Sequence, residues 1–250
     1  MENKQFKCKN CEGKNYKVKY DFLVRKILQC QSCHLMIIDP VPCEKELRQV
    51  YNENYFSNLA LTTADVNNVF GYVDYISERI NKQSGYEKIC KTLRKYSIPP
   101  SIQRPKLLDF GCGLGFFLET ANQYGFDVSG LEFNNFAIDY IKKIYPFKVE
   151  LFDNDKFGQI KYQIITFFDV IEHLRDPFKI LKKTYQGLDN NGIIAITTAN
   201  SNGFVPRLLG KKLEDFRRIN EHIYFFSKYN LIKNLSEISF HILEVKSIAH

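Results

Sequence analysis

The pattern of hydrophobic and polar positions changes near residue 100. From residue 101 onward, short apolar runs that predict strands alternate with stretches of three- and four-residue apolar spacing that predict helices. Such alternation predicts a parallel sheet with right-handed crossovers. We predict strands at residues 106–110, 127–132, 147–150, 161–168, 192–198, 223–226 and 242–248, and helices at residues 115–124, 135–144, 177–185 and 228–237. For residues 101–250, this pattern therefore predicts an α/β fold with a seven-stranded, mostly parallel sheet and helices on both faces.

The segment before this region, residues 41–100, has helical spacing. A short helix is predicted at residues 44–51, a longer one runs from a cap at Asp65 to Ile80, and a third carries Tyr86 to Tyr96. Its aromatic residues include Tyr51, Tyr55, Phe56, Phe70, Tyr72 and Tyr75. The pattern fits either a helical cover packed on the sheet edge or a lid that closes over a ligand to exclude water. Both interpretations remain open.

The N-terminal segment, residues 1–40, contains two cysteine pairs, Cys8-x-x-Cys11 and Cys30-x-x-Cys33, which are separated by 18 residues. This spacing matches the pattern of a structural zinc site with four cysteines. The alternating residues between the pairs predict a hairpin that brings the thiolates together, and four cysteines leave no open metal position for catalysis. The alternatives are an iron centre on the same thiolates or disulfides, which a cytosolic chain disfavours. The segment therefore predicts a zinc ribbon with four cysteine ligands.

Composition and charge change this picture only modestly. A hydrophobic fraction of 44% and a charged fraction of 25% are typical of a soluble globular protein. The chain has no run of 18 apolar residues and a polar N-terminus, so we expect a cytoplasmic location and no membrane partner. Residues 1–30 hold eight Lys and Arg against three acids, which permits nucleic-acid binding without requiring it. The remaining cysteines, predicted to be buried small hydrophobic residues, are Cys43, Cys90 and Cys112.

A glycine-rich turn follows the first predicted strand of the α/β region, with the sequence Asp109-Phe110-Gly111-Cys112-Gly113-Leu114-Gly115. Glycine serves such a turn because it adopts positive φ and lets a ligand approach the backbone. A strand, a tight turn and a helix N-terminus are typical of nucleotide-like ligand sites in open α/β sheets. The G-x-G-x-G spacing after an acidic residue resembles the cofactor motif of S-adenosylmethionine-dependent methyltransferases with a Rossmann-like fold. The resemblance implies S-adenosylmethionine as the cofactor.

A carboxylate at the end of the second predicted strand supports this interpretation. Glu132 lies 23 positions after Asp109, where its carboxylate can accept both ribose hydroxyls, as in the dinucleotide-binding fold. The resemblance also implies that Asp109 lies near the cationic methionine portion of the cofactor and that Asp153 contacts adenine. The predicted cofactor-binding residues are Asp109, Gly111, Cys112, Gly113, Gly115, Glu132, Phe133, Asp153 and Asp169.

Two histidine-containing segments supply the candidate catalytic groups. The fourth predicted strand leads into Asp169-Val-Ile-Glu172-His173-Leu, and Glu221-His222 precedes an aromatic run. Both segments resemble methyltransferases that act on small molecules, including ubiquinone-pathway and sugar O-methyltransferases. Methyl transfer to a hydroxyl requires a positioned acceptor and removal of its proton, and histidine suits this task near neutral pH. His173 and His222 are predicted as base or substrate contact, with a structural role as the alternative, and Glu172 would orient a histidine or face a helix N-terminus.

These features together resemble a class I methyltransferase with a zinc-ribbon segment (1–40), a helical cover (41–100) and a methyltransferase domain (101–250). The expected acceptor is a hydroxyl of a sugar, nucleotide sugar or related polar metabolite. Basic residues at positions 207, 211, 212, 217 and 218 would suit a phosphate-bearing substrate or form a solvated helix face. One alternative is a ribosomal-RNA base methyltransferase that holds RNA with its basic ribbon. Another is a non-catalytic module that binds the cofactor or a partner protein.

Overall fold

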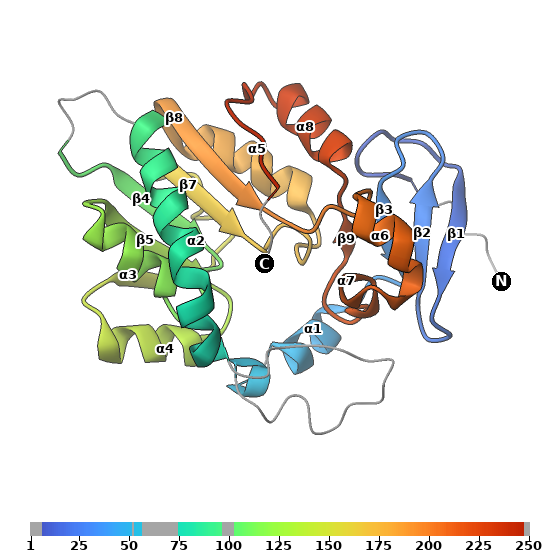
Figure 1. Ribbon diagram of the computed structural model, residues 1–250, viewed down its shortest axis with the longest axis horizontal. Helices are drawn as coiled ribbons and strands as arrows, with labels where there is room; N and C mark the ends of the chain where they lie inside the picture. Colours follow the sequence, from blue (N-terminus) through green and yellow to red (C-terminus); the bar gives the residue numbers. More distant parts are fainter. Residues whose placement is uncertain (1–6, 52, 57–74, 97–102, 248–250) are drawn as a thin grey trace.

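The computed structural model describes residues 7–51, 53–56, 75–96 and 103–247. Figure 1 shows a larger parallel sheet flanked by helices and, toward the N-terminal end of the molecule, a smaller antiparallel sheet. Within these described residues, no helix combines the length and hydrophobicity needed to cross a bilayer.

The larger sheet has five parallel strands. Their spatial order is β6 (Lys148–Leu151), β5 (Asp127–Glu132), β4 (Lys106–Phe110), β7 (Tyr162–Phe168) and β8 (Leu188–Thr197). The chain runs outward from β4 to β6 and then returns to the other side of β4 for β7. In open α/β sheets, ligands bind at such a reversal, beyond the carboxyl ends of the strands. The fold thus brings the residues after β4 and after β7 to one edge.

Alternate residues of each strand face two separate hydrophobic cores, as the two-residue period of a strand requires. Leu107 belongs to one core and its neighbour Leu108 to the other. The helices are α2 (Tyr75–Tyr96), α3 (Phe116–Gln123) and α4 (Asn135–Ile144) on the Leu107 face, and α5 (Pro177–Gly187) on the Leu108 face. The predicted α/β fold with helices on both faces is confirmed.

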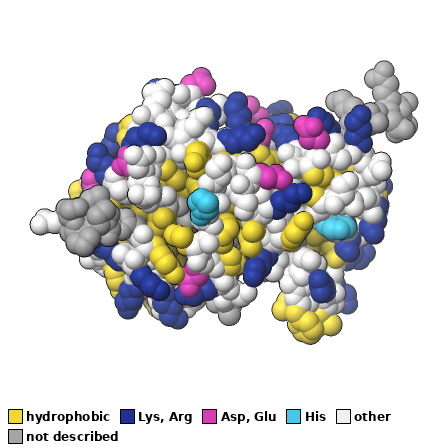
Figure 2. All heavy atoms as spheres, turned by 90° about the horizontal axis from the view of Figure 1, so that it is seen from above, with side chains coloured by type: hydrophobic (Ala, Val, Ile, Leu, Met, Phe, Trp, Pro, Cys, Tyr) yellow, Lys and Arg dark blue, Asp and Glu magenta, His cyan; other side chains and the backbone are white. Residues whose placement is uncertain are grey.

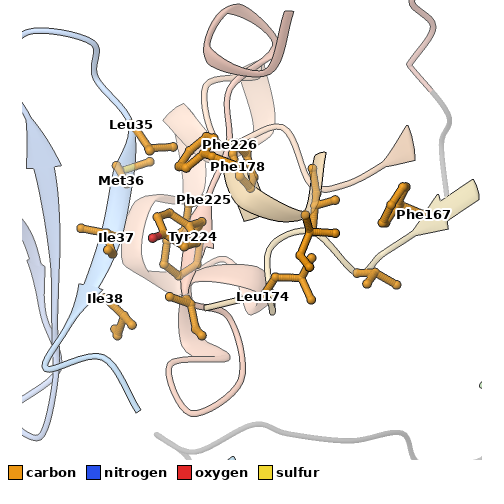
Figure 3. Close-up of a cluster of buried hydrophobic side chains, with 14 of the residues drawn as sticks. Leu35, Met36, Ile37, Ile38, Phe167, Leu174, Phe178, Tyr224, Phe225 and Phe226 are labelled. Atoms are coloured by element: carbon orange, nitrogen blue, oxygen red, sulfur yellow. The ribbon is translucent and has the colours of Figure 1, made fainter. Parts of the chain in front are cut away.

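The smaller sheet joins the two ends of the chain. Its antiparallel strands, in spatial order, are β1 (Tyr16–Asp21), β2 (Lys26–Cys30), β3 (Met36–Asp39) and β9 (Tyr224–Phe225). Ile37 pairs with Tyr224 across this sheet, and Figure 3 shows their side chains side by side. The same hydrophobic core continues to Phe167 of the larger sheet (Figure 3), so the two sheets share one core.

The prediction of seven strands in the main sheet is wrong, because the described sheet has five. The predicted strand at residues 223–226 exists as β9, but it pairs with β3 in the smaller sheet. Residues 242–247 form no strand, and residue 248 lies outside the described part of the chain. A strand needs a neighbouring backbone to pair with, and an apolar pattern carries no information about that neighbour.

The cover segment begins with two short helices, α1 (Glu44–Val50) and η1 (Glu53–Phe56). Helix α2 is continuous through the positions where the prediction separated two helices, and most of the helix predicted from Asp65 lies outside the described residues. The predicted domain limits at residues 40 and 100 stay predictions.

Short helices also fill the connection between β8 and β9. They are α6 (Phe204–Leu209), η3 (Gly210–Lys212) and α7 (Glu214–Arg217), and α8 (Lys228–Glu237) follows β9 as predicted. Among the three remaining cysteines, Cys90 and Cys112 are buried as predicted. The prediction for Cys43 is wrong, since this cysteine is exposed at the N-cap of α1.

Candidate functional site

The glycine turn leaves β4 in a backbone conformation that other residues rarely adopt. Gly111, Gly113 and Gly115 have φ values of +77°, +53° and +83°. A Cβ atom on Gly111 would lie 2.6 Å from Val170, which follows β7, so the turn also fits closely against the neighbouring strand end. The Gly111 amide donates to the Leu131 carbonyl of β5 at 2.7 Å. The turn is therefore held rigidly between the ends of β5 and β7.

Glu132, the last residue of β5, ties the strand to this turn. Its Oε2 accepts a hydrogen bond from the Gly113 amide at 2.7 Å, and its Oε1 accepts from the amides of Phe133 and Asn134 at 2.7 and 3.0 Å. Burial raises the pKa of Glu132, and the three amide donors oppose this shift because they stabilise the carboxylate. The residue predicted to bind ribose thus lies at the predicted edge and also shapes the glycine turn.

Asp109 is buried in the middle of the same edge. Its Oδ1 accepts a hydrogen bond of 2.6 Å from the hydroxyl of Thr166 in β7. Burial, only partly offset by this bond, raises the pKa of Asp109 to about 7. A buried carboxyl group of this kind gains most from a cationic neighbour, since a positive charge favours its ionised form.

Aromatic rings border the far side of the turn. Phe133 is 42% exposed, and its ring centroid lies 4.9 Å from that of Phe152 and 5.6 Å from that of Phe110. Asp153 follows directly, but its carboxylate accepts from the Asp155 amide and pairs with Lys156 in a local turn. The exposed ring of Phe133 offers a flat apolar surface beside Glu132.

Asp169, directly after β7, has a φ of +55°, which is uncommon for a residue other than glycine. Its amide donates to Thr197 of β8, and the Thr197 hydroxyl donates to Asp169 Oδ1 at 3.0 Å. This turn follows β7 directly and leads to Glu172 and His173. Strained backbone of this type is concentrated at functional sites.

His173 lies half-buried at the junction of the cover and the main sheet. Its Nδ1 is 2.8 Å from the hydroxyl of Tyr51, at the end of α1, and 3.1 Å from the backbone carbonyl of Glu221. A carbonyl oxygen only accepts hydrogen bonds, so Nδ1 carries the ring proton and Nε2 keeps its lone pair. Burial lowers the pKa of His173 and favours the neutral ring.

His222 packs against His173, with ring centroids 4.6 Å apart in an edge-to-face arrangement. It donates a hydrogen bond to the backbone carbonyl of Asp215, and burial lowers its pKa well below the ordinary value. Glu172 is buried beside the two rings, and in the described residues its Oε2 has no hydrogen-bond partner. Burial raises the pKa of Glu172 well above its ordinary value, with the Asp169 charge as a second cause.

Among the residues that the structure describes, two clusters have side chains close enough to hold a metal ion. The ligand atoms of Glu172, His173 and His222 lie within 4.8 Å of one another. The second cluster is the predicted set of Cys8, Cys11, Cys30 and Cys33, whose sulfur atoms also lie within 4.8 Å of one another. This donor set and its closeness fit a tetrahedral thiolate site.

Both histidines open onto a large cleft with a volume of about 2340 Å³. Its walls come from α2, β8, α6, α8 and the segment after α8. Figure 2 shows hydrophobic side chains gathered along the middle of the face seen from above. The cleft is large enough for an acceptor molecule beside His173.

Four contacts between described residues of the site were not predicted from the sequence. They are the Tyr51 hydroxyl on His173, the Thr166 hydroxyl on Asp109, the ion pair of Arg218 with the Glu221 carboxylate, and the Tyr55 hydroxyl on the same carboxylate. Tyr51 and Tyr55 belong to the aromatic group of the cover segment, and that aromatic group is the signal in the sequence that points to these contacts. The partners are up to 166 positions apart, so no local pattern pairs them.

The fold is that of the class I, Rossmann-like, S-adenosylmethionine-dependent methyltransferases. A family model described as a methyltransferase domain matches residues 78–245, which is more than half of the chain, and the chain belongs to this family.

Curated relatives and solved structures agree with this assignment. The ubiquinone biosynthesis O-methyltransferase of Pelagibacter ubique is 27% identical over 180 residues, which cover 63% of this chain and 75% of the relative. The enzyme of the same name from Hydrogenovibrio crunogenus is 24% identical, and the match covers 41% of this chain and less than half, 46%, of that relative.

Among solved structures, the magnesium protoporphyrin IX methyltransferase of Synechocystis PCC 6803 with bound S-adenosylhomocysteine has a TM-score of 0.55 at 16% identity. The match covers 81% of this chain and 91% of that one. An S-adenosylmethionine-dependent methyltransferase from Mesorhizobium loti has a TM-score of 0.52 at 17% identity. The match covers 66% of this chain and 85% of that one. At this identity, both structures support the fold.

Proposed function

We propose that this methyltransferase methylates a hydroxyl group of a small polar acceptor, such as a sugar, a nucleotide sugar or a related metabolite. The observation that carries this proposal is the neutral His173, whose ring is oriented by Tyr51 and Glu221 and opens onto the large cleft. A hydroxyl acceptor needs a base, whereas the activated methyl group comes with the cofactor. The O-methyltransferase activity in the names of the curated relatives supports the same acceptor atom.

The cofactor residues in this proposal are those at the carboxyl edge of β4 and β5. The Glu132 carboxylate would accept the ribose hydroxyls, the Phe133 ring would stack on the adenine, and Asp109 would face the cationic methionine portion. The buried carboxyl of Asp109, with its raised pKa, fits a positively charged partner. The positive φ values of the glycine turn fit a ligand that approaches the backbone. Asp153, held in its own turn, would contact adenine at the rim.

His173 is the base in this proposal. Since Nδ1 carries the proton, the Nε2 lone pair is available to take the proton of the acceptor hydroxyl. The half-buried position of His173 makes it more accessible from the cleft than His222, which is 6% exposed. His222 and Glu172 would then pack beside the base and limit its orientation.

We expect replacement of Glu132 by alanine to weaken S-adenosylhomocysteine binding about 30-fold, because each hydrogen bond to a charged acceptor contributes about 1.5–3 kcal/mol. Titration calorimetry measures this change. Asp127→Ala, at the exposed opposite end of the same strand, is the matched control and should leave the affinity unchanged. Equal affinities for the Glu132→Ala variant and the parent protein would remove Glu132 from the ribose site.

Tyr51 is a positioning residue in this mechanism, because it acts through His173. Tyr51→Phe should lower kcat about 3- to 10-fold, the equivalent of one neutral hydrogen bond, and should change the pH dependence of kcat. S-adenosylhomocysteine affinity should be retained. Tyr229→Phe, at a 65% exposed tyrosine of α8, serves as the control. An unchanged kcat and pH profile for Tyr51→Phe would contradict this role.

We also propose that the four clustered cysteines hold one structural zinc ion. The closeness of four thiol groups from two tight turns supports zinc, and the full set of four protein ligands suits a site without catalytic activity.

The decisive test of the function is a transfer assay with methyl-labelled S-adenosylmethionine against nucleotide sugars, free sugars, catechol-type quinone precursors and RNA. Labelling of a hydroxyl acceptor that requires His173 supports the proposal. Labelling of RNA alone, with RNA binding that weakens steeply as salt increases, favours the ribosomal-RNA alternative. Cofactor binding without turnover on every acceptor favours the non-catalytic module.

A further inference from the structure

Helix α6 exposes a continuous group of large hydrophobic side chains. Phe204 is 80% exposed, Val205 52%, Leu208 72% and Leu209 43%. Their spacing of one and four residues places them on one side of the helix. Exposed apolar residues that occur singly need no explanation, but a contiguous group on one short element marks an interaction site.

Positive charge surrounds this helix. Arg207 lies on α6 itself, and Lys211 and Lys212 follow in η3, all three exposed. Of the acidic groups close by, Glu214 pairs with Arg218, and Asp21 pairs with Lys26 while its charge also interacts with Lys211. A short apolar element bordered by basic residues is the pattern of a segment that lies in the interface of an anionic bilayer.

We propose that α6 and η3 dock this protein onto the surface of a lipid bilayer with anionic headgroups. The four exposed apolar side chains enter the boundary between headgroups and acyl chains, and Arg207, Lys211 and Lys212 contact the headgroups. Contact between two copies through the same face is less favourable, because an isologous interface would bring the basic residues of one copy against those of the other. This surface departs from the expectation, drawn from the sequence, of no membrane partner.

The position of this face relative to the cleft gives the docking a functional consequence. Phe204, Val205 and Pro206 line the same cleft as His173 and His222. A bilayer under α6 therefore lies at the mouth of the cleft. An acceptor with a polar head and an apolar chain would reach the cleft directly from the bilayer.

The test is a flotation assay of the purified full chain with vesicles of phosphatidylcholine alone or mixed with phosphatidylglycerol. The proposal expects binding to the mixed vesicles and weaker binding to the neutral ones. The double variant Phe204→Ser/Leu208→Ser should lose affinity for mixed vesicles by about tenfold or more. Lys211→Gln/Lys212→Gln should weaken binding and reduce its salt dependence.

Ile80→Ser, at an 82% exposed isoleucine of α2, is the matched control and should bind vesicles like the parent chain. Retained S-adenosylhomocysteine binding shows that each variant is folded, and the flotation result does not depend on which acceptor is methylated. Absence of vesicle binding by the parent chain, or equal binding by the α6 double variant, would overturn the proposal. A dimer that the α6 substitutions dissociate, with no vesicle binding, would assign this face to self-association.

Discussion

Replacing His173 by alanine is expected to lower kcat by about 10²- to 10⁴-fold, the usual contribution of a positioned general base. The substitution removes the Nε2 lone pair of His173, since Nδ1 of this ring contacts Tyr51 and the Glu221 carbonyl. Affinity for S-adenosylhomocysteine should change little, because His173 contributes nothing to the turn that Glu132 holds. Single-turnover rates with labelled cofactor, together with calorimetry, measure the two quantities separately.

The pH dependence provides a second readout of the same prediction. Burial lowers the pKa of His173 below the ordinary histidine value of 6.5. The ring therefore stays neutral, and able to act as a base, at neutral pH and down to pH 6.5. The acid limb of the kcat/KM profile should therefore lie below pH 6.5 and should disappear in His173→Ala. His241→Asn, at an exposed histidine of the same cleft, is the control and should keep the full profile. If His173→Ala retains most of kcat while His222→Ala loses it, the base is His222.

Loss of the proposed zinc ion should destabilise the hydrophobic core that the two sheets share as well as the N-terminal ribbon. Cys8, Cys30 and Cys33 are buried in the hydrophobic core that also contains Ile37 and Tyr224. Structural zinc contributes about 10–16 kcal/mol to the folding of small metal domains, which exceeds what their cores supply. We expect Cys30→Ser to abolish zinc binding and to lower the melting temperature by about 10 °C or more.

Metal analysis of the purified chain should find close to one zinc ion per protein molecule. Cys43→Ser is the natural control, since Cys43 is exposed and lies outside the cluster. This variant should keep both the metal content and the melting temperature. A metal-free parent chain with the same melting temperature as the metal-loaded one would refute the zinc assignment. If the purified chain contains iron in place of zinc, the four cysteines form the alternative iron centre.

The parts of the site that could be predicted from the sequence are those whose residues lie close together in the chain. The glycine turn, Asp109 before it and Glu132 at the end of the next strand follow from the order of strands and the special backbone needs of glycine. The helix at residues 135–144 was predicted to the residue because its apolar spacing, its Asn134 cap and Pro146 all act locally.

Long-range pairing explains what could not be predicted. The segment at residues 223–226 has the same apolar character in either sheet, and only its pairing with β3 removes it from the main one. Cys43 resembles Cys90 in the sequence, yet it lies exposed at a helix N-cap while Cys90 is buried under the main sheet. An apolar pattern indicates which residues can be buried, but whether and against which segment they are buried depends on the tertiary fold.

The sequence by itself determined the order of strands and helices around the glycine turn, the class of cofactor that the turn resembles and the pairing of cysteines by spacing. Each of these depends on residues within one turn or one βαβ unit. Only the tertiary structure decided that Tyr51 contacts His173 across 122 positions, that β9 completes the sheet of the N-terminal segment, and that α6 leaves Phe204 and Leu208 exposed. These features arise from packing between distant segments, and local periodicity cannot encode which distant surfaces meet or which remain uncovered.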